Sequence, residues 1–157
     1  MKRLSLAAAV LLSVFSCRNR EYVGPHGEEV QYSSNGKNVK VKGADGSVVV
    51  SGEGVTLPED FPKDVPIYPG SRLASAVSAS QSGNSGHMVT FLTPDVPEKV
   101  AAFYKSKFSR WNIKMEMSSG GGKVLLLQAP DEKRSLTMVA NPANGVTTVT
   151  LTAQEPK

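Results

Sequence analysis

Apolar and polar residues alternate with a period of two along residues 28–56, a pattern typical of β-strands. Asn35-Gly36 and Asp45-Gly46 interrupt the alternation, and these dipeptides favour tight hairpin turns because both residues readily adopt positive φ. Three short strands joined by turns are therefore predicted as a small β-meander. A repeat architecture is a weaker interpretation because the units are short and dissimilar. The apolar positions of the strands are Val30, Tyr32, Val39, Val41 and the valines at 48–50.

The same alternation returns in residues 73–157 and predicts six further strands, interrupted by one helix. Apolar residues recur at spacings of three and four from Val96 to Trp111, which is typical of an amphipathic helix of about four turns. Asp95 is expected to cap this helix, with Pro97 in its first turn. The predicted fold class is α+β: an antiparallel sheet of about six strands covered by one amphipathic helix, in the order ββαββββ, preceded by the short β-meander. The six strands fall at about residues 73–80, 87–93, 113–117, 124–129, 136–140 and 146–153.

A proline-rich strap, residues 57–72, joins the meander to the rest of the chain. Its prolines fix φ and bias the preceding residues toward extended geometry, so the strap cannot form a helix. We expect it to cross the surface along a stiff, extended path. Phe61 and Tyr68 in the strap are available to contact a partner, although packing of the strap against the domain is the favoured alternative. The face of the sheet that the helix leaves open is then either partly solvated or covered by the strap and the meander.

The amino terminus has the pattern of an export signal. Lys2 and Arg3 precede an almost wholly apolar run, residues 4–15, which is well short of the ~20 residues needed to span a bilayer. The run ends in Val14-Phe15-Ser16-Cys17, which resembles the lipobox of bacterial lipoprotein signal peptides. The resemblance implies removal of residues 1–16, a diacylglyceryl group on the Cys17 thiol, and a tether over residues 17–27. The alternative is an ordinary secretory signal that is cleaved elsewhere.

Cysteine content and charge agree with this interpretation. Cys17 is the only cysteine, so no intramolecular disulfide can form, and a single exported thiol calls for modification or intermolecular pairing. The net charge of +4 falls to +2 when Lys2 and Arg3 are removed, which leaves 16 basic and 14 acidic side chains. We therefore expect no nucleic-acid partner. Arg18 after the cysteine favours the outer membrane in a cell that has two membranes.

Residue patterns for catalysis or metal binding are weak in this chain. A Ser-His hydrolase built on Ser85 and His87 is the enzyme alternative, but adjacent residues on a hairpin turn do not point at each other. The other histidine, His26, lies in the predicted tether. We predict no catalytic residue, no metal and no cofactor. A soft Cu(I) site is the metal alternative, but methionines on one strand face ordinarily fill a core; its ligands would be His87, Met88, Met115, Met117 and Met138.

Three further patterns are better explained without a ligand. Gly120-Gly121-Gly122-Lys123 lacks the spacing and the following helix of a phosphate loop, so we interpret it as a hairpin turn. Basic residues around the helix would suit anionic lipid headgroups, but a charged face is usually just solvated; they are Lys99, Lys105, Arg110 and Lys114. Carboxylates in turns and in the strap lack an apolar wall that would raise a pKa; they are Glu59, Asp60, Asp64, Asp131 and Glu132.

The segments DVPIYPGS and TPDVPEKVAAFYKSKF, with the hairpin between them and the Gly-rich turn after them, resemble domains of small bacterial lipoproteins of unknown function. The resemblance covers residues 57–153 and implies no catalytic residue. We therefore expect a non-catalytic binding or assembly module of the cell envelope, held by its lipid anchor, whose partner is an envelope protein, a glycan or a lipid. The alternatives are a small-ligand or metal-binding lipoprotein and, less favoured, an envelope hydrolase.

Overall fold

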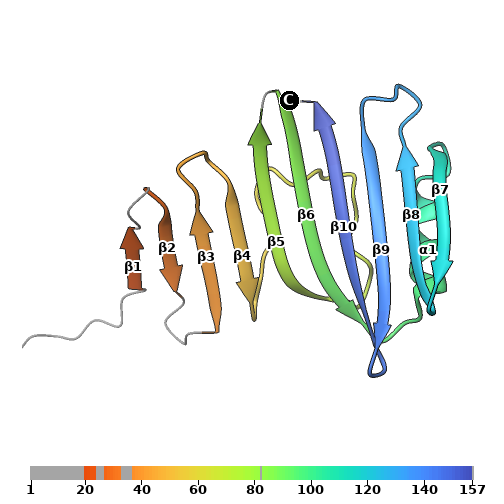
Figure 1. The fold of residues 1–157 in the computed structure, drawn as a ribbon, viewed down its shortest axis with the longest axis horizontal. Coiled ribbons are helices and arrows are strands. Elements are labelled where there is room, and N and C mark those ends of the chain that lie inside the picture. Colours follow the sequence, from red (N-terminus) through yellow and green to blue (C-terminus); the bar gives the residue numbers. More distant parts are fainter. Residues whose placement is uncertain (1–19, 24–26, 33–36, 82, 157) are drawn as a thin grey trace, which may run out of the picture.

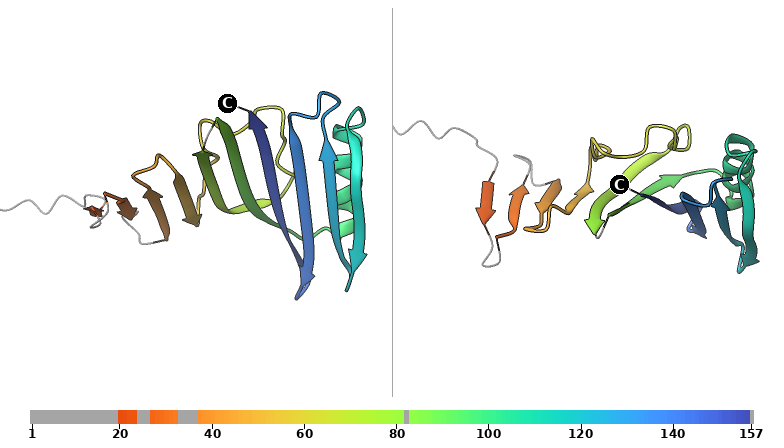
Figure 2. Two further views of the ribbon diagram at one scale, coloured as in Figure 1. Left: turned by 45° about the horizontal axis from the view of Figure 1, so that its top comes forward. Right: turned by 90° about the horizontal axis from the view of Figure 1, so that it is seen from above.

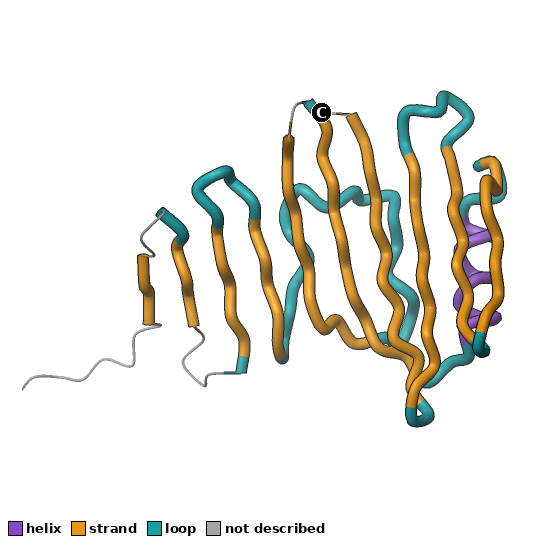
Figure 3. The backbone as a smooth tube through the Cα atoms, in the orientation of Figure 1, coloured by secondary structure: helices purple, strands orange, loops and turns teal. Residues whose placement is uncertain are grey.

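The described residues form one antiparallel sheet of ten strands with a helix at one end, as the computed structural model shows (Figure 1, Figure 3). The structure describes residues 20–23, 27–32, 37–81 and 83–156. The predicted signal peptide, Cys17, Arg18 and His26 lie outside the described residues. In space the strands follow the order β1-β2-β3-β4-β5-β6-β10-β9-β8-β7. Their bounds are β1 Arg20–Val23, β2 Glu29–Tyr32, β3 Asn38–Lys42, β4 Val48–Gly52, β5 Arg72–Gln81, β6 Asn84–Thr93, β7 Asn112–Ser119, β8 Gly122–Gln128, β9 Ser135–Ala143 and β10 Val146–Pro156.

The predicted fold class, a six-stranded sheet under an amphipathic helix with a separate meander before it, is wrong. The segments assigned to the meander belong to the same sheet as the rest, because β4 pairs with β5 through registers such as Val50 with Ala76. Pairing of this kind satisfies the backbone groups that β5 would otherwise expose as a free edge. The helix is too short to cover the sheet and packs mainly against β8 and β9.

The helix α1, Pro97–Lys107, is shorter than the predicted four turns. Its N-cap is Val96, in an extended conformation and without a side-chain cap, and Pro97 begins the helix without needing a hydrogen-bond partner for an N–H. The predicted cap Asp95 instead accepts hydrogen bonds from the Tyr68 hydroxyl at 2.7 Å and the Lys99 ammonium at 2.8 Å. The Lys99 ammonium and then the Tyr68 hydroxyl lower the pKa of Asp95. The helical residues that are buried are Pro97, Val100, Ala101 and Tyr104.

The core lies on one face of the sheet, beneath a layer that the helix and the strap build together. Figure 2 shows both of them on the same side of the strands. Alternate residues of the longer strands point into this layer and are buried, as the period of two requires. The largest of them are Val89 and Phe91 of β6, Leu125 and Leu127 of β8, Leu136 and Met138 of β9, and Val149 and Leu151 of β10.

The strap is part of the core. Phe61 and Tyr68 are each only 6% exposed, so neither side chain offers the partner surface that the sequence suggested. Burial of their rings against the sheet accounts for this, with Tyr68 stacked on Phe91 and Phe61 against the His87 ring. Of the two alternatives for the second face of the sheet, a cover formed by the strap is wrong, because the strap lies on the helix side (Figure 2).

Polar contacts in the middle of the strap hold it in place. The Tyr104 hydroxyl of α1 donates to the Pro66 carbonyl at 3.0 Å. Arg134 donates two hydrogen bonds of 2.8 Å to the Asp64 carboxylate, and its guanidinium lies over the Trp111 ring. The bidentate hydrogen bond from Arg134 lowers the pKa of Asp64 below its ordinary value of 3.8. The strap therefore depends on an ionised Asp64.

Asp64→Asn should destabilise the fold at neutral pH by about 0.5–1 kcal/mol, the size of a partly exposed ion pair. Because the folded-state pKa of Asp64 is lowered, its contribution is present above the ordinary value of 3.8 and is lost as the pH falls through the folded-state pKa. Chemical denaturation of both proteins at several pH values should show their stabilities converging in acid. Glu59→Gln, an exposed position of the same strap, is the control and should follow the wild type. A difference between Asp64→Asn and wild type that stays constant down to the lowest pH would contradict the assignment.

Candidate functional site

The face of the sheet that points away from the strap and the helix carries two rows of uncharged side chains, which we call the open face. Thr90 and Thr150, neighbours in one row, have hydroxyl oxygens 3.4 Å apart on this side. The first row is Val30, Val41, Val49, Val77, Met88, Thr152, Thr137, Leu126 and Met115. The second row is Tyr32, Val39, Ser51, Ser75, Thr90, Thr150, Val139, Val124 and Met117.

The open face is apolar to a degree that is unusual for a solvated sheet surface. Antiparallel sheets that are covered on one side ordinarily place polar residues on the other. Here neither row contains a charged side chain, and the residues that are not apolar are threonines and serines. The most exposed members are Met117 at 54%, Met88 and Tyr32 at 44% each, and Met115 at 39%. The prediction that Met115 and Met117 fill the core is therefore wrong.

β2 and β3 have their apolar side on the open face. In β3, Val39 and Val41 lie in the two rows, whereas Lys40 and Lys42 point to the side on which the strap lies. These two strands thus place an apolar surface opposite to the side on which the chain builds its own covering layer. Because their apolar side chains point to the open face, β2 and β3 would bury apolar area there and not on the strap side.

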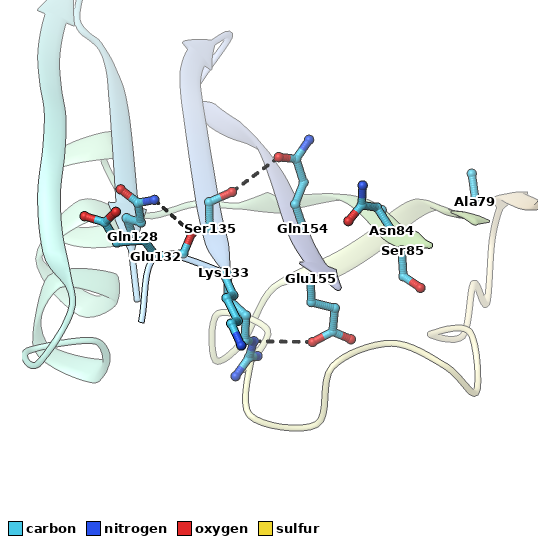
Figure 4. A pocket seen from close by; sticks show the side chains of 11 residues that line it. Ala79, Asn84, Ser85, Gln128, Glu132, Lys133, Ser135, Gln154 and Glu155 are labelled. Atoms are coloured by element: carbon cyan, nitrogen blue, oxygen red, sulfur yellow. Dashed lines mark hydrogen bonds and ion pairs between the residues drawn. The ribbon is translucent and has the colours of Figure 1, made fainter. Parts of the chain in front are cut away.

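A polar groove of about 680 Å³ lies at the end of the sheet where the β5–β6 hairpin, the end of β10 and the β8–β9 turn meet (Figure 4). Arg134 and Glu155 form an ion pair at its floor, with 3.3 Å between Nε and Oε2. The Ser135 hydroxyl donates to the Gln154 side-chain oxygen at 3.4 Å. The other side chains that line the groove are those of Ala79, Asn84, Ser85, Gln128, Glu132 and Lys133. Carboxamides and hydroxyls of this kind suit a polar ligand.

The one buried histidine of the described chain belongs to a polar cluster that fastens the strap. The Ser78 hydroxyl donates to Asp60 of the strap at 3.0 Å, and the Nδ1 atom of His87 lies 2.9 Å from the same hydroxyl. Because Ser78 has one proton to donate, His87 supplies the proton of the second contact. The Nε2 atom of His87 is 4.0 Å from Glu155. Ser78 and His87 are 3% and 2% exposed, so no substrate reaches them in this arrangement.

The Ser85–His87 pair that the sequence raised does not form. The Ser85 hydroxyl lies 3.3 Å from that of Ser80, and His87 faces Ser78 across the hairpin. Sequence reasoning missed Ser78 because it placed the turn too late in the chain. The register that pairs Ser80 with Ser85 also pairs Ser78 with His87, and a prediction that paired Gln81 with Asn84 would have revealed it.

The structure also separates the candidate metal ligands. Met88, Met115 and Met117 lie on the open face, whereas His87 and Met138 are buried under the strap and the helix. Within the described ranges, no group of three or more His, Cys, Asp or Glu side chains is placed to hold a metal ion. In the same part of the chain, no helix is long and apolar enough to cross a membrane.

The remaining candidates have structural contacts. Gly120 and Gly121 adopt positive φ in the β7–β8 turn, which explains the glycines without a phosphate, and Lys123 donates to the Ser118 hydroxyl at 2.7 Å. Three of the four basic residues near the helix have acidic partners: Lys99 pairs with Asp95 and Lys105 with Glu116, each at 2.8 Å, and Lys114 lies 3.8 Å from Glu132. Asp131 accepts a hydrogen bond from the backbone N–H of Lys133.

Comparison with known proteins gives one match. Residues 73–156, which run from the second residue of β5 to the end of β10, match the family model described as START domain-like. A search of curated proteins finds no match. A search of solved structures finds none either. The matched segment contains the helix and the longer strands, whereas β1–β4 and the strap lie before it.

Ser78→Ala should destabilise the fold by about 1–3 kcal/mol, because it leaves the buried His87 ring without its Nδ1 partner and frees Asp60 of the strap. The measurement is the free energy of unfolding in urea. Ser80→Ala removes a hydroxyl two residues away that is exposed, and it should change stability by less than about 0.5 kcal/mol. Equal losses in the two variants would show that the Ser78 cluster does not hold the strap.

Proposed function

The chain belongs to the START domain-like family, and we propose that it is a non-catalytic binding module. We further propose that an acylated Cys17 anchors it to a membrane of the cell envelope and that the open face is its binding surface. The observation that carries the binding proposal is the open face itself. A sheet surface with two uncharged, mainly apolar rows is a typical protein-interaction site.

Two features support the lipid anchor. The amino-terminal pattern of two basic residues, an apolar run and Val14-Phe15-Ser16-Cys17 is that of a lipoprotein signal. The described chain starts at β1, the edge strand farthest from the helix, so a tether would leave from one end of the sheet (Figure 1). Anchored there, the module would hold its longer strands at a distance from the membrane, with neither face of the sheet turned toward the attachment point.

The absence of catalysis is part of the proposal, and the buried position of the one described histidine supports it. A nucleophile needs a base and an open path to substrate. Ser78 and His87 make the contact that a nucleophile and a base would make, but the strap covers them and the Ser78 hydroxyl donates its hydrogen bond to Asp60. We assign this cluster to the docking of the strap.

The polar groove favours a second candidate function, the binding of a small polar ligand. Its volume is within the range of small-molecule sites, although those are usually more apolar. Native mass spectrometry and thermal shift with sugars, amino acids and short peptides would test it. A Gln154→Ala variant should lose any shift that such a ligand produces. An unchanged mass and melting temperature across that set would reject the groove as a ligand site.

Placement of a photo-crosslinking residue in the full chain tests the open face in intact cells. Crosslinkers at Met88 and Met117 should give products of the same mass, because both positions lie on one surface. The matched control is Ala102, which is exposed on the helix and should give none of that product. Products that are equally strong from Ala102, or no product from any position on the open face, would refute the binding proposal.

Cys17→Ala should release the protein from the membrane fraction, because the substitution removes the only thiol that can carry the diacylglyceryl group. Cell fractionation followed by immunoblotting measures this, and metabolic labelling with a fatty acid should lose its signal in the same variant. Ser13→Ala, within the apolar run, is the control and should remain both labelled and membrane-bound. Retention of unlabelled Cys17→Ala protein on membranes after removal of the signal would locate the anchor elsewhere.

A further inference from the structure

We propose that the occupant of the open face is a second copy of this chain, so that two sheets pack face to face as a symmetric dimer. The inference rests on the proposed function, since it names the partner of the same surface. In such a dimer, Val, Thr and Met side chains of the two open faces would interdigitate across about 10 Å, the usual separation of stacked sheets.

Self-complementarity is the first argument for a second copy. A twofold interface places the same patch on both sides, so any charge in the patch would face a like charge or lie close to one. The two rows contain no charged residue from β2 to β7, although 20% of the residues of the chain are charged. A surface of this kind can meet its own copy without repulsion.

The arrangement of polarity around the two rows is the second argument. The residues that flank them are mainly polar: on one side Ala79, Gly86, Gln154, Ser135 and Gln128, and on the other Arg72, Leu92, Thr148 and Asn141. An apolar centre between polar margins is the usual anatomy of a protein interface. The interface would then end at these margins, and the groove beside Gln154 would remain open.

Area is the third argument. Strands about 4.8 Å apart and same-face residues about 6.8 Å apart give two rows from β2 to β7 roughly 600 Å² of surface in each copy. Two copies would bury about 1,200 Å², the lower limit for a specific and stable interface. The face is therefore large enough for a dimer without help from other parts of the chain.

The position of the predicted anchor is compatible with this dimer. A twofold axis that runs parallel to the rows, from the β1 end of the sheet to the β7 end, keeps the two β1 strands at the same end of the dimer. Both tethers could then enter one membrane. An anionic membrane surface is a poorer occupant of the open face, because neither row offers a Lys or Arg to its headgroups.

The oligomeric state of the full chain, extracted in mild detergent and measured by native mass spectrometry and analytical ultracentrifugation, tests the inference. The wild type should be a dimer, and Thr150→Lys should raise its dissociation constant at least about 100-fold, because two unpaired ammonium groups would be buried in the interface. Thr150→Ser and Ala102→Lys, the second on the exposed side of the helix, should remain dimers. Circular dichroism should show all variants to be folded.

Cross-linking in intact cells provides a second measurement without detergent. A cysteine placed at Thr150, which is the one free thiol when Cys17 is acylated, should give a product of twice the chain mass with a thiol-specific reagent that spans about 10 Å. The same cysteine combined with Val139→Lys should not. If the wild type is monomeric in detergent and the cysteine at position 150 gives no such product, the proposal that a second copy occupies the open face is wrong.

The two proposals fail in different ways. If the chain is monomeric but Met88 and Met117 crosslink to another envelope protein, the second copy is wrong and the binding function survives. If neither a dimer nor any product from the open face is found, both are wrong. If Thr150→Lys stays dimeric, the chain dimerises through another surface and the inference is overturned.

Discussion

The fold depends on one constraint: a sheet has two faces, and this chain builds a covering layer for one of them. That layer consists of α1 and the strap, and both pack on the same side. Docking of Phe61, Val65 and Tyr68 buries the face toward which Phe91 and His87 point. Each polar group that the strap brings into this layer has a partner, and no described side chain has a buried polar atom left unsatisfied. The other face is left with half-buried rows and no cover from the described part of the chain.

The amino-terminal strands make the uncovered face larger. β1–β4 lie before the segment that matches the START domain-like family, and they join it through the pairing of β4 with β5. The strap cannot cover all of them, and Lys40 and Lys42 of β3 point to its side. Val39 and Val41 therefore add apolar area only on the open face. Strands that served merely as a spacer would not need apolar side chains on one face and lysines on the other. The valines of β3 therefore favour a role in contact with a partner.

The sequence predicted the positions of many strands and turns, because a period of two and Asn-Gly or Asp-Gly dipeptides are local signals. It could not show which face of a strand becomes the core. Met115 and Met117 share a face of β7 under any register, but whether that face is exposed depends on the side on which α1 packs. The contact of Glu116 with Lys105 of α1 shows that the helix lies on the opposite side from the two methionines. This contact is known only from the structure. Asp95 fails as a cap for a similar reason, because Tyr68 of the distant strap competes for its carboxylate.

Association through the strand edges is a competing route, and the edge at β7 is poorly suited to it. A free edge strand exposes backbone groups that pair readily with another chain, and charged side chains or a bulge prevent this. β7 has an irregularity between Ile113 and Met115, and Lys114 and Glu116 alternate with its apolar residues. At the other edge, β1 falls within residues 17–27, the segment predicted as a tether, and so lies close to the predicted anchor. With one edge irregular and charged and the other close to the predicted membrane attachment, the open face is the broad apolar surface that remains accessible. Contact through the open face would bury apolar residues both of the segment that matches the family and of the strands that precede it.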